Sequence, residues 1–127
     1  MYDNIFVAAA ALAGAAAVGA VAWRAYKKWK NGVRDEVRAW LQTRPNVRLR
    51  SVSLRVFDAL DEAATRGESF VRCALIGKTE QGGECQIGDI KRLTAEEMRN
   101  VGVLTDSGVV KEKEILSDNE VLTLMTA

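Results

Sequence analysis

The chain has 127 residues, of which 48% are hydrophobic, 18 basic, 17 acidic and none histidine. This length allows one small domain, and the lack of histidine excludes Ser-His and Cys-His catalytic dyads and removes the commonest metal ligand. The formal charge of +1 is a cancellation, because residues 1–23 carry −1, residues 24–55 carry +8 and residues 56–127 carry −6.

The first predicted element is an apolar helix at residues 5–23. These 19 residues include no charged side chain, and ten of them are alanine. At a rise of about 1.5 Å per residue the helix would span about 28 Å, close to the hydrocarbon thickness of a bilayer. The run therefore predicts a transmembrane helix after a short exterior N-terminus, residues 1–4. An Ala-rich helix buried in a soluble bundle and a cleaved signal peptide are the alternatives, although the leader lacks the positive charge that a signal peptide carries.

A stripe of small residues runs along this helix. Ala11, Ala15 and Gly19 recur every four residues, and small side chains at that spacing allow two helix backbones to approach closely. We expect this face to pack helix against helix, so a homo-oligomer is one expected state of the chain.

Aromatic and basic residues follow the apolar run directly. They are Trp23, Arg24, Lys27, Lys28, Trp29, Lys30 and Arg34. Rings and long cationic chains of this kind anchor a helix at headgroup depth and attract anionic lipid, so these residues predict an interface with the lipid bilayer. Positive residues beside a span tend to stay in the cytoplasm, and the expected topology is therefore N-terminus outside and C-terminus cytoplasmic.

Residues 24–44 predict a basic amphipathic juxtamembrane helix that continues from the span. Its apolar stripe has helical spacing and consists of Trp29, Val33, Val37, Trp40 and Leu41. We expect one of two outcomes for the stripe. It packs on the domain or on a neighbouring subunit, or it inserts into the headgroup layer of the membrane. A solvated linker without a packed side is the third interpretation. Pro45, the only proline, ends this helix because the residue before a proline is pushed out of the α region.

Residues 45–127 predict a small cytoplasmic α+β domain of antiparallel hairpins with packed helices. Its first helix is expected over residues 51–67, between a serine N-cap and a stop at Gly67. Residues 47–56 also fit a strand, because their apolar residues alternate, and the sequence leaves this choice open.

Turn residues punctuate the rest of the domain. Residues 70–76 and 85–90 flank the Gly82-Gly83 pair and predict a first hairpin. A second hairpin is expected around the turn at residues 105–108. The alternating charges of residues 111–114 predict an edge strand that is protected against aggregation.

Two short helices are expected between and after these hairpins. The capping box Thr94–Glu97 predicts the start of one helix, and Gly102 its end. The capping box Ser117–Glu120 predicts the start of a second helix near the C-terminus.

The motif search indicates no cofactor and no metal. Gly77-Lys78-Thr79 resembles the end of a phosphate-binding loop, but Arg72 stands where that motif requires glycine. A winged helix is excluded because residues 89–102 leave room for one short helix, and the charge of −6 opposes DNA binding. No nucleic-acid partner is therefore expected.

The two cysteines, Cys73 and Cys85, are expected to be reduced and unbridged. A two-residue turn at Gly82-Gly83 would pair position 85 with 80 and position 73 with 92. The cysteines would then lie about 23 Å apart along the hairpin, whereas a disulfide requires Cα atoms within about 7 Å.

These observations predict a non-enzymatic, membrane-anchored subunit or adaptor of a membrane-associated assembly. It would present its small domain for protein–protein interaction, with other membrane or membrane-associated proteins as partners. The alternative is a small pore-forming or membrane-remodelling protein that acts through the Ala-rich span. An enzyme with a cysteine- or carboxylate-centred site is a third hypothesis.

Overall fold

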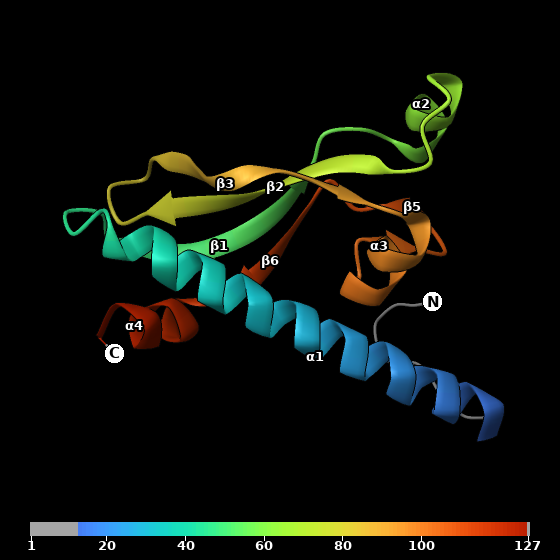
Figure 1. Cartoon of the computed structure of the whole chain (residues 1–127), viewed down its shortest axis with the longest axis horizontal. Helices are drawn as coiled ribbons and strands as arrows, with labels where there is room; N and C mark the ends of the chain where they lie inside the picture. The colour runs from blue at the N-terminus through green and yellow to red at the C-terminus, as the bar shows by residue number, and fades with distance from the viewer. Residues whose placement is uncertain (1–12, 127) are drawn as a thin grey trace.

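The computed structural model describes residues 13–126, and side chains from Trp23 onward (Figure 1). The elements in chain order are α1 (Ala13–Gln42), β1 (Leu49–Val56), α2 (Leu60–Thr65), β2 (Val71–Thr79), β3 (Glu84–Leu93), α3 (Ala95–Val101), β4 (Leu104–Thr105), β5 (Gly108–Val109), β6 (Glu112–Leu116) and α4 (Asp118–Thr126). Four strands form an antiparallel sheet in the order β3-β2-β1-β6, and β4 pairs with β5 alone. In Figure 1, α1 crosses beneath this sheet, and its first turns project past it.

The core lies between the sheet and the two longer helices. In β1, Val52, Leu54 and Val56 are buried on the face that meets α1 and α4, because alternate side chains of a strand point the same way. The other side of β1 carries Ser53 and Arg55, which face away from the helices. Apolar side chains from nearly every element close this core: Val33, Val37, Leu49, Cys73, Leu75, Ile87, Met98, Val103, Leu116 and Val121.

The prediction of a transmembrane helix is wrong. Among residues 13–126, no helix is long and apolar enough to cross a membrane. Helix α1 continues through the expected membrane boundary at Trp23 to Gln42, and beyond that boundary it carries charged residues such as Arg24, Lys27 and Asp35. The physical reason is composition, because alanine is only weakly apolar and basic residues begin at Arg24. Residues 1–4, the first part of the expected span and Ala11 lie outside the described residues.

The other predictions that depended on a membrane span lose their basis with this correction. A membrane-anchored protein and a juxtamembrane helix both required the span. The two-sided topology and the pore-forming alternative depended on the same helix, so neither is carried forward. The residues expected at a membrane interface lie in α1, and their contact with lipid stays a prediction.

The apolar stripe of residues 24–44 packs on the chain's own sheet. Val33 and Val37 are 3% and 0% exposed, and Trp29, Trp40 and Leu41 pack partly buried against the same core. This is the first of the outcomes expected for the stripe. Helix α1 therefore forms one wall of the domain.

The expected helix over residues 51–67 is wrong in its first half, where β1 stands. The neighbouring strands favour a strand over a helix at residues 49–56. There β1 pairs with both β2 and β6, so its backbone groups form hydrogen bonds on both sides. Ser51 and Ser53, expected as N-caps, are buried in the strand. Only α2 is helical, and Gly67 follows its C-cap with a φ of 78°, as the expected stop requires.

The first hairpin forms from β2 and β3, but its register differs from the prediction. Cys85 lies opposite Gly77, and Cys73 lies opposite Lys91. Residues 80–83 make a longer turn than the Gly82-Gly83 pair alone, and β3 shifts register between the partners of Cys73 and Leu75, where Gly88 has a φ of 76°. The two cysteines still occupy different, well-separated pairs, so the absence of a disulfide stays a prediction.

The capping box at Thr94 is confirmed. The Glu97 backbone N–H donates to Thr94 Oγ1 at 3.2 Å, and the Thr94 N–H donates to Glu97 Oε1 at 2.8 Å. Helix α3 ends at Gly102, which has a φ of 84°. The next hairpin is shorter than expected, because only β4 and β5 pair within it.

The strand predicted from the charges of residues 111–114 is β6, and it is an edge strand that pairs with β1. The last helix, α4, starts where the second capping box places it. There the Ser117 N–H donates to Glu120 Oε1 at 3.0 Å.

Candidate interaction site on helix α1

Three ion pairs join α1 to the rest of the domain. Glu120, at the start of α4, accepts from Lys30 Nζ at 2.8 Å and from Arg34 at 2.7 Å. On the other side of the helix, Lys91 of β3 lies 2.7 Å from Glu36. Together with Val33 and Val37 between them, these contacts determine which side of α1 faces the sheet and which side faces solvent.

The Glu120 carboxyl has a strongly shifted pKa. Burial alone would raise it, but hydrogen bonds from Lys30, the Ser117 N–H and Arg34 outweigh burial and lower the pKa to about 2. The carboxylate is therefore charged at neutral pH and joins α1 to α4. The sequence predicted only a capping role for Glu120, because its partners Lys30 and Arg34 are 90 and 86 positions away in the chain.

A row of aromatic rings marks the point at which α1 leaves the domain. The ring centroids of Trp23 and Tyr26 are 6.0 Å apart, and those of Tyr26 and Trp29 are 6.4 Å apart. Lys113 Nζ lies 5.2 Å from the Tyr26 ring centroid, which ties the middle of the row to the rest of the domain. Trp23, the outermost ring, is 56% exposed.

The residues predicted to lie at a lipid interface divide into two groups. Trp29, Lys30 and Arg34 are directed to the domain, where the first packs against the core and the other two bind Glu120. The other four residues have exposed side chains: Trp23, Arg24, Lys27 and Lys28. Of the stripe of small residues, Ala15 and Gly19 lie in α1, and Ala11 lies outside the described residues.

We call Trp23, Arg24 and Lys27 the aromatic–basic face. These three residues sit on the solvent-facing side of α1 within little more than one turn, and all three are exposed. A large amphipathic ring beside two cations has the composition of binding hot spots, which are enriched in tryptophan and arginine.

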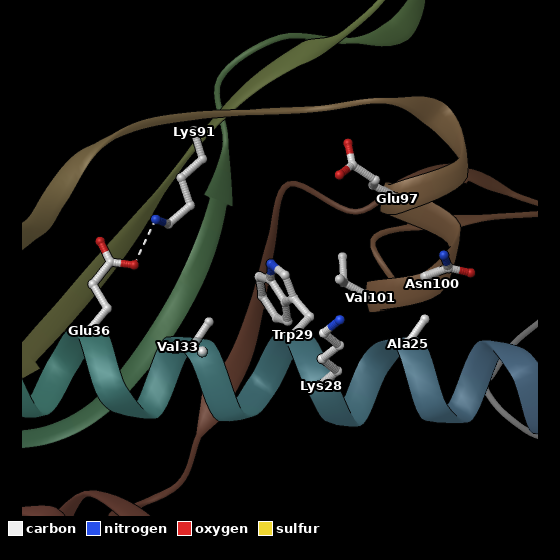
Figure 2. A pocket seen from close by; sticks show the side chains of 10 residues that line it. Ala25, Lys28, Trp29, Val33, Glu36, Lys91, Glu97, Asn100 and Val101 are labelled. Carbon is white, nitrogen blue, oxygen red and sulfur yellow. Dashed lines mark hydrogen bonds and ion pairs between the residues drawn. The ribbon is translucent and has the colours of Figure 1, made fainter.

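A groove lies beside this face, between α1, α3 and β3 (Figure 2). Its volume is about 550 Å³, and Trp29 and Val33 of α1 face Val101 of α3 across its apolar part. The Glu36–Lys91 ion pair closes one end. Lys28 borders the groove on α1, and Glu97 borders it on α3, so its two sides differ in charge.

Four ionisable residues on the outer side of the sheet form an ion-pair network. Arg55 of β1 lies 2.8 Å from both Glu84 and Glu112, and Lys78 lies 2.6 Å from Glu112. A hydrogen bond from Lys78 lowers the pKa of Glu112, and one from Arg55 lowers the pKa of Glu84. This network crosses all four strands and was missed by sequence analysis, because its members are far apart in the chain.

Asp58 forms a second structural cluster, also missed. Its carboxylate, 4% exposed, accepts two hydrogen bonds of 2.9 Å from the Arg72 guanidinium and lies 3.1 Å from Arg66. The hydrogen bond from the Arg72 side chain is the main cause that holds the pKa of Asp58 far below its ordinary value. The cluster fastens the loop around α2 to the end of β2.

Neither cysteine has the surroundings of a nucleophile. Burial raises the pKa of the Cys73 thiol to about 11, and burial also raises that of Cys85, so both are protonated at neutral pH. Over the part of the chain that the structure describes, no three Cys, Asp or Glu residues cluster in a way that could hold a metal ion.

In comparisons with protein-family models, with curated proteins and with solved structures, nothing matched the chain.

Proposed function

We propose that the protein is a non-enzymatic adaptor or subunit of a larger assembly, and that the aromatic–basic face of α1 is its docking surface for another protein. The observation that carries the proposal is the exposure of Trp23. An indole ring that is 56% exposed beside Arg24 and Lys27 has no share in the core of its own domain. Its burial against a partner would contribute apolar area together with two charge contacts.

The arrangement of the ionisable groups also supports a binding role. The most perturbed carboxylates, Asp58 and Glu120, have pKa values lowered by arginine and lysine partners and are held in contacts between elements. A general acid or base at neutral pH needs a pKa near the operating pH, which these groups lack. Both carboxylates join elements of the fold and therefore contribute to its stability. The exposed side of α1 remains available for binding another protein.

Charge defines the kind of partner. The cations of the aromatic–basic face favour a protein with an acidic surface and an apolar pocket that admits the Trp23 indole. Electrostatic complementarity of this kind raises the association rate and is weakened by salt.

The test is affinity purification of the full-length chain from its own cells, with bound proteins quantified by mass spectrometry. We expect the double variant Arg24→Glu/Lys27→Glu to lose a specific partner. The matched control, Arg38→Glu/Arg48→Glu, changes the net charge equally at exposed arginines elsewhere and should retain it. The proposal is wrong if both double variants retain, or both lose, the same proteins.

A further inference from the structure

We infer that the groove between α1 and α3 is a self-association surface, filled by α1 of a second copy of this chain in antiparallel orientation. This self-association rests on the proposed role of the protein as an interaction module. It uses a different side of α1 from the aromatic–basic face. Its residues are Ala25, Lys28, Trp29 and Gly32 on α1, with Glu97 on α3.

Open space along α1 is the first observation. No heavy atom lies within 4 Å of the position that a Cβ of Gly32 would take. Ala25, seven residues earlier, has only a methyl group on the same side of the helix, since seven residues make about two turns. Two small residues two turns apart allow a second helix backbone to approach closely, at the short end of the 8–10 Å range of packed helices.

The order of residues along this side is nearly palindromic. A two-fold axis passing between residues 28 and 29 would place residue i of one copy opposite residue 57 − i of the other. Ala25 of each copy then lies opposite Gly32 of the other, and Lys28 of each copy lies opposite Trp29 of the other. The two-fold axis therefore produces each contact twice. The small residues meet, and each Lys28 ammonium is brought over the indole of the other copy, where cation–π attraction is favourable. Such self-complementarity is what a two-fold contact between identical chains requires.

Charge points to the same occupant. The groove has a cation, Lys28, on its α1 side and a carboxylate, Glu97, on its α3 side. A second α1 laid in the groove would bring its own Lys28 toward Glu97, and symmetry would repeat that contact at the other end. The chain as a whole has the same complementarity, with +8 in residues 24–55 and −6 in residues 56–127.

Cysteine pairing tests this geometry directly on the full-length chain. Ala25→Cys and Gly32→Cys are prepared as separate variants, mixed under mild oxidation, and run on non-reducing gels. We expect a disulfide-linked dimer in the mixture, because positions 25 and 32 of different copies are opposite. Each variant alone should give much less, since its two copies of one position lie about 10 Å apart along the helices, beyond the reach of a disulfide. Equal yields in the mixture and in the single variants would overturn the antiparallel register.

Sedimentation velocity supplies the second test. The wild-type chain is expected to be dimeric at about 100 µM, and Gly32→Leu should weaken dimerisation at least about tenfold while the thermal midpoint stays unchanged or rises. Lys28→Glu should weaken it as well, whereas Lys27→Glu should not, because Lys27 points about 100° away around α1 and does not line the groove. A wild-type monomer at this concentration, or a Gly32→Leu variant that dimerises normally, would overturn the inference. Loss of the dimer would leave the partner test with Arg24 and Lys27 unaffected, so the two proposals fail separately.

Discussion

Helix α1 has two parts that differ in what surrounds them. Around Val33 and Val37 the helix packs on the sheet, and ion pairs join it to Glu120 of α4 and to Lys91 of β3. Around Trp23 and Lys27 the same helix has left the sheet, and these side chains are exposed. One continuous element therefore supplies both a wall of the core and a free surface. The role of a side chain in this helix therefore depends on its neighbours in the fold as well as on its own chemistry.

The two tryptophans make this comparison concrete. Trp23 and Trp29 belong to one aromatic row and differ by six positions, yet the first is 56% exposed and the second is packed against the core. If the account is right, substitutions should have large effects on stability in the packed part and small ones in the exposed part.

The largest effect is expected from Val37→Asp. Val37 is 0% exposed, so the variant buries a carboxylate that has no partner, at a cost of about 3–5 kcal/mol in the free energy of unfolding. Urea unfolding followed by circular dichroism measures the loss. The control, Ala39→Asp, lies on the exposed side of α1 and should cost less than about 1 kcal/mol. Equal losses from both variants would contradict the assignment of the packed side.

Glu120→Gln should have the next largest effect, and one that depends on pH. The folded pKa of about 2 lies below the ordinary 4.5, so the carboxylate contributes stability above about pH 4.5 and loses that contribution as the pH falls toward 2. With screening by solvent included, we expect the variant to be about 1–2 kcal/mol less stable than wild type at pH 7.

The difference between Glu120→Gln and wild type should shrink as the pH is lowered from 5 toward 2, because the wild-type carboxylate then binds a proton. Thermal unfolding at a series of pH values measures it, and Asp118→Asn, two residues away in α4 and exposed, is the matched control. A difference that stays constant over this pH range would show that the ion pairs with Lys30 and Arg34 do not hold α1 to α4.

A smaller effect of opposite sign is expected where the two parts of α1 join. Gly32 is a mid-helix glycine whose Cβ position is open, so Gly32→Ala should stabilise the fold by about 0.5–1 kcal/mol through the entropy of the unfolded chain. The thermal midpoint of the purified chain measures this. Destabilisation would mean that the space beside Gly32 is filled and that the groove is not open at this position.

Trp23→Ala should change stability least, by less than about 0.5 kcal/mol, because an exposed ring contributes little to the core. Trp29→Ala is the matched comparison and should cost clearly more, since that ring packs against the core. Chemical denaturation of the two variants side by side checks the order. If Trp23→Ala is the more damaging change, the aromatic–basic face is structural.

The sequence correctly predicted those features of the fold that depend on a few neighbouring residues. The capping box at Thr94 and Glu97, the glycine that ends α3, and the charged edge strand β6 are of this kind. The apolar stripe around Val33 and Val37 also located the packed side of α1, because helical periodicity records which side is buried.

Features that depend on distant partners were not predictable in the same way. The pairing of β1 with both β2 and β6 decides that Ser51 and Ser53 lie in a strand, and neither partner is visible from the local pattern. The ion pairs of Glu120 with Lys30 and Arg34 join residues about 90 positions apart, so no spacing rule reveals them. For the candidate site, the aromatic and basic residue types were found, but the bilayer interface assigned to them rested on a span that fails.

The most direct test of the account's central claim, that the exposed end of α1 is a docking surface, is photocrosslinking of the full-length chain in its own cells. Benzoylphenylalanine is placed at position 23 in one strain and at position 39, exposed on the packed part of the same helix, in another. The account predicts a defined crosslink to a second polypeptide from position 23 that is absent from position 39 and lost in the Arg24→Glu/Lys27→Glu background. Equal crosslinking from both positions, or none from position 23, would contradict it.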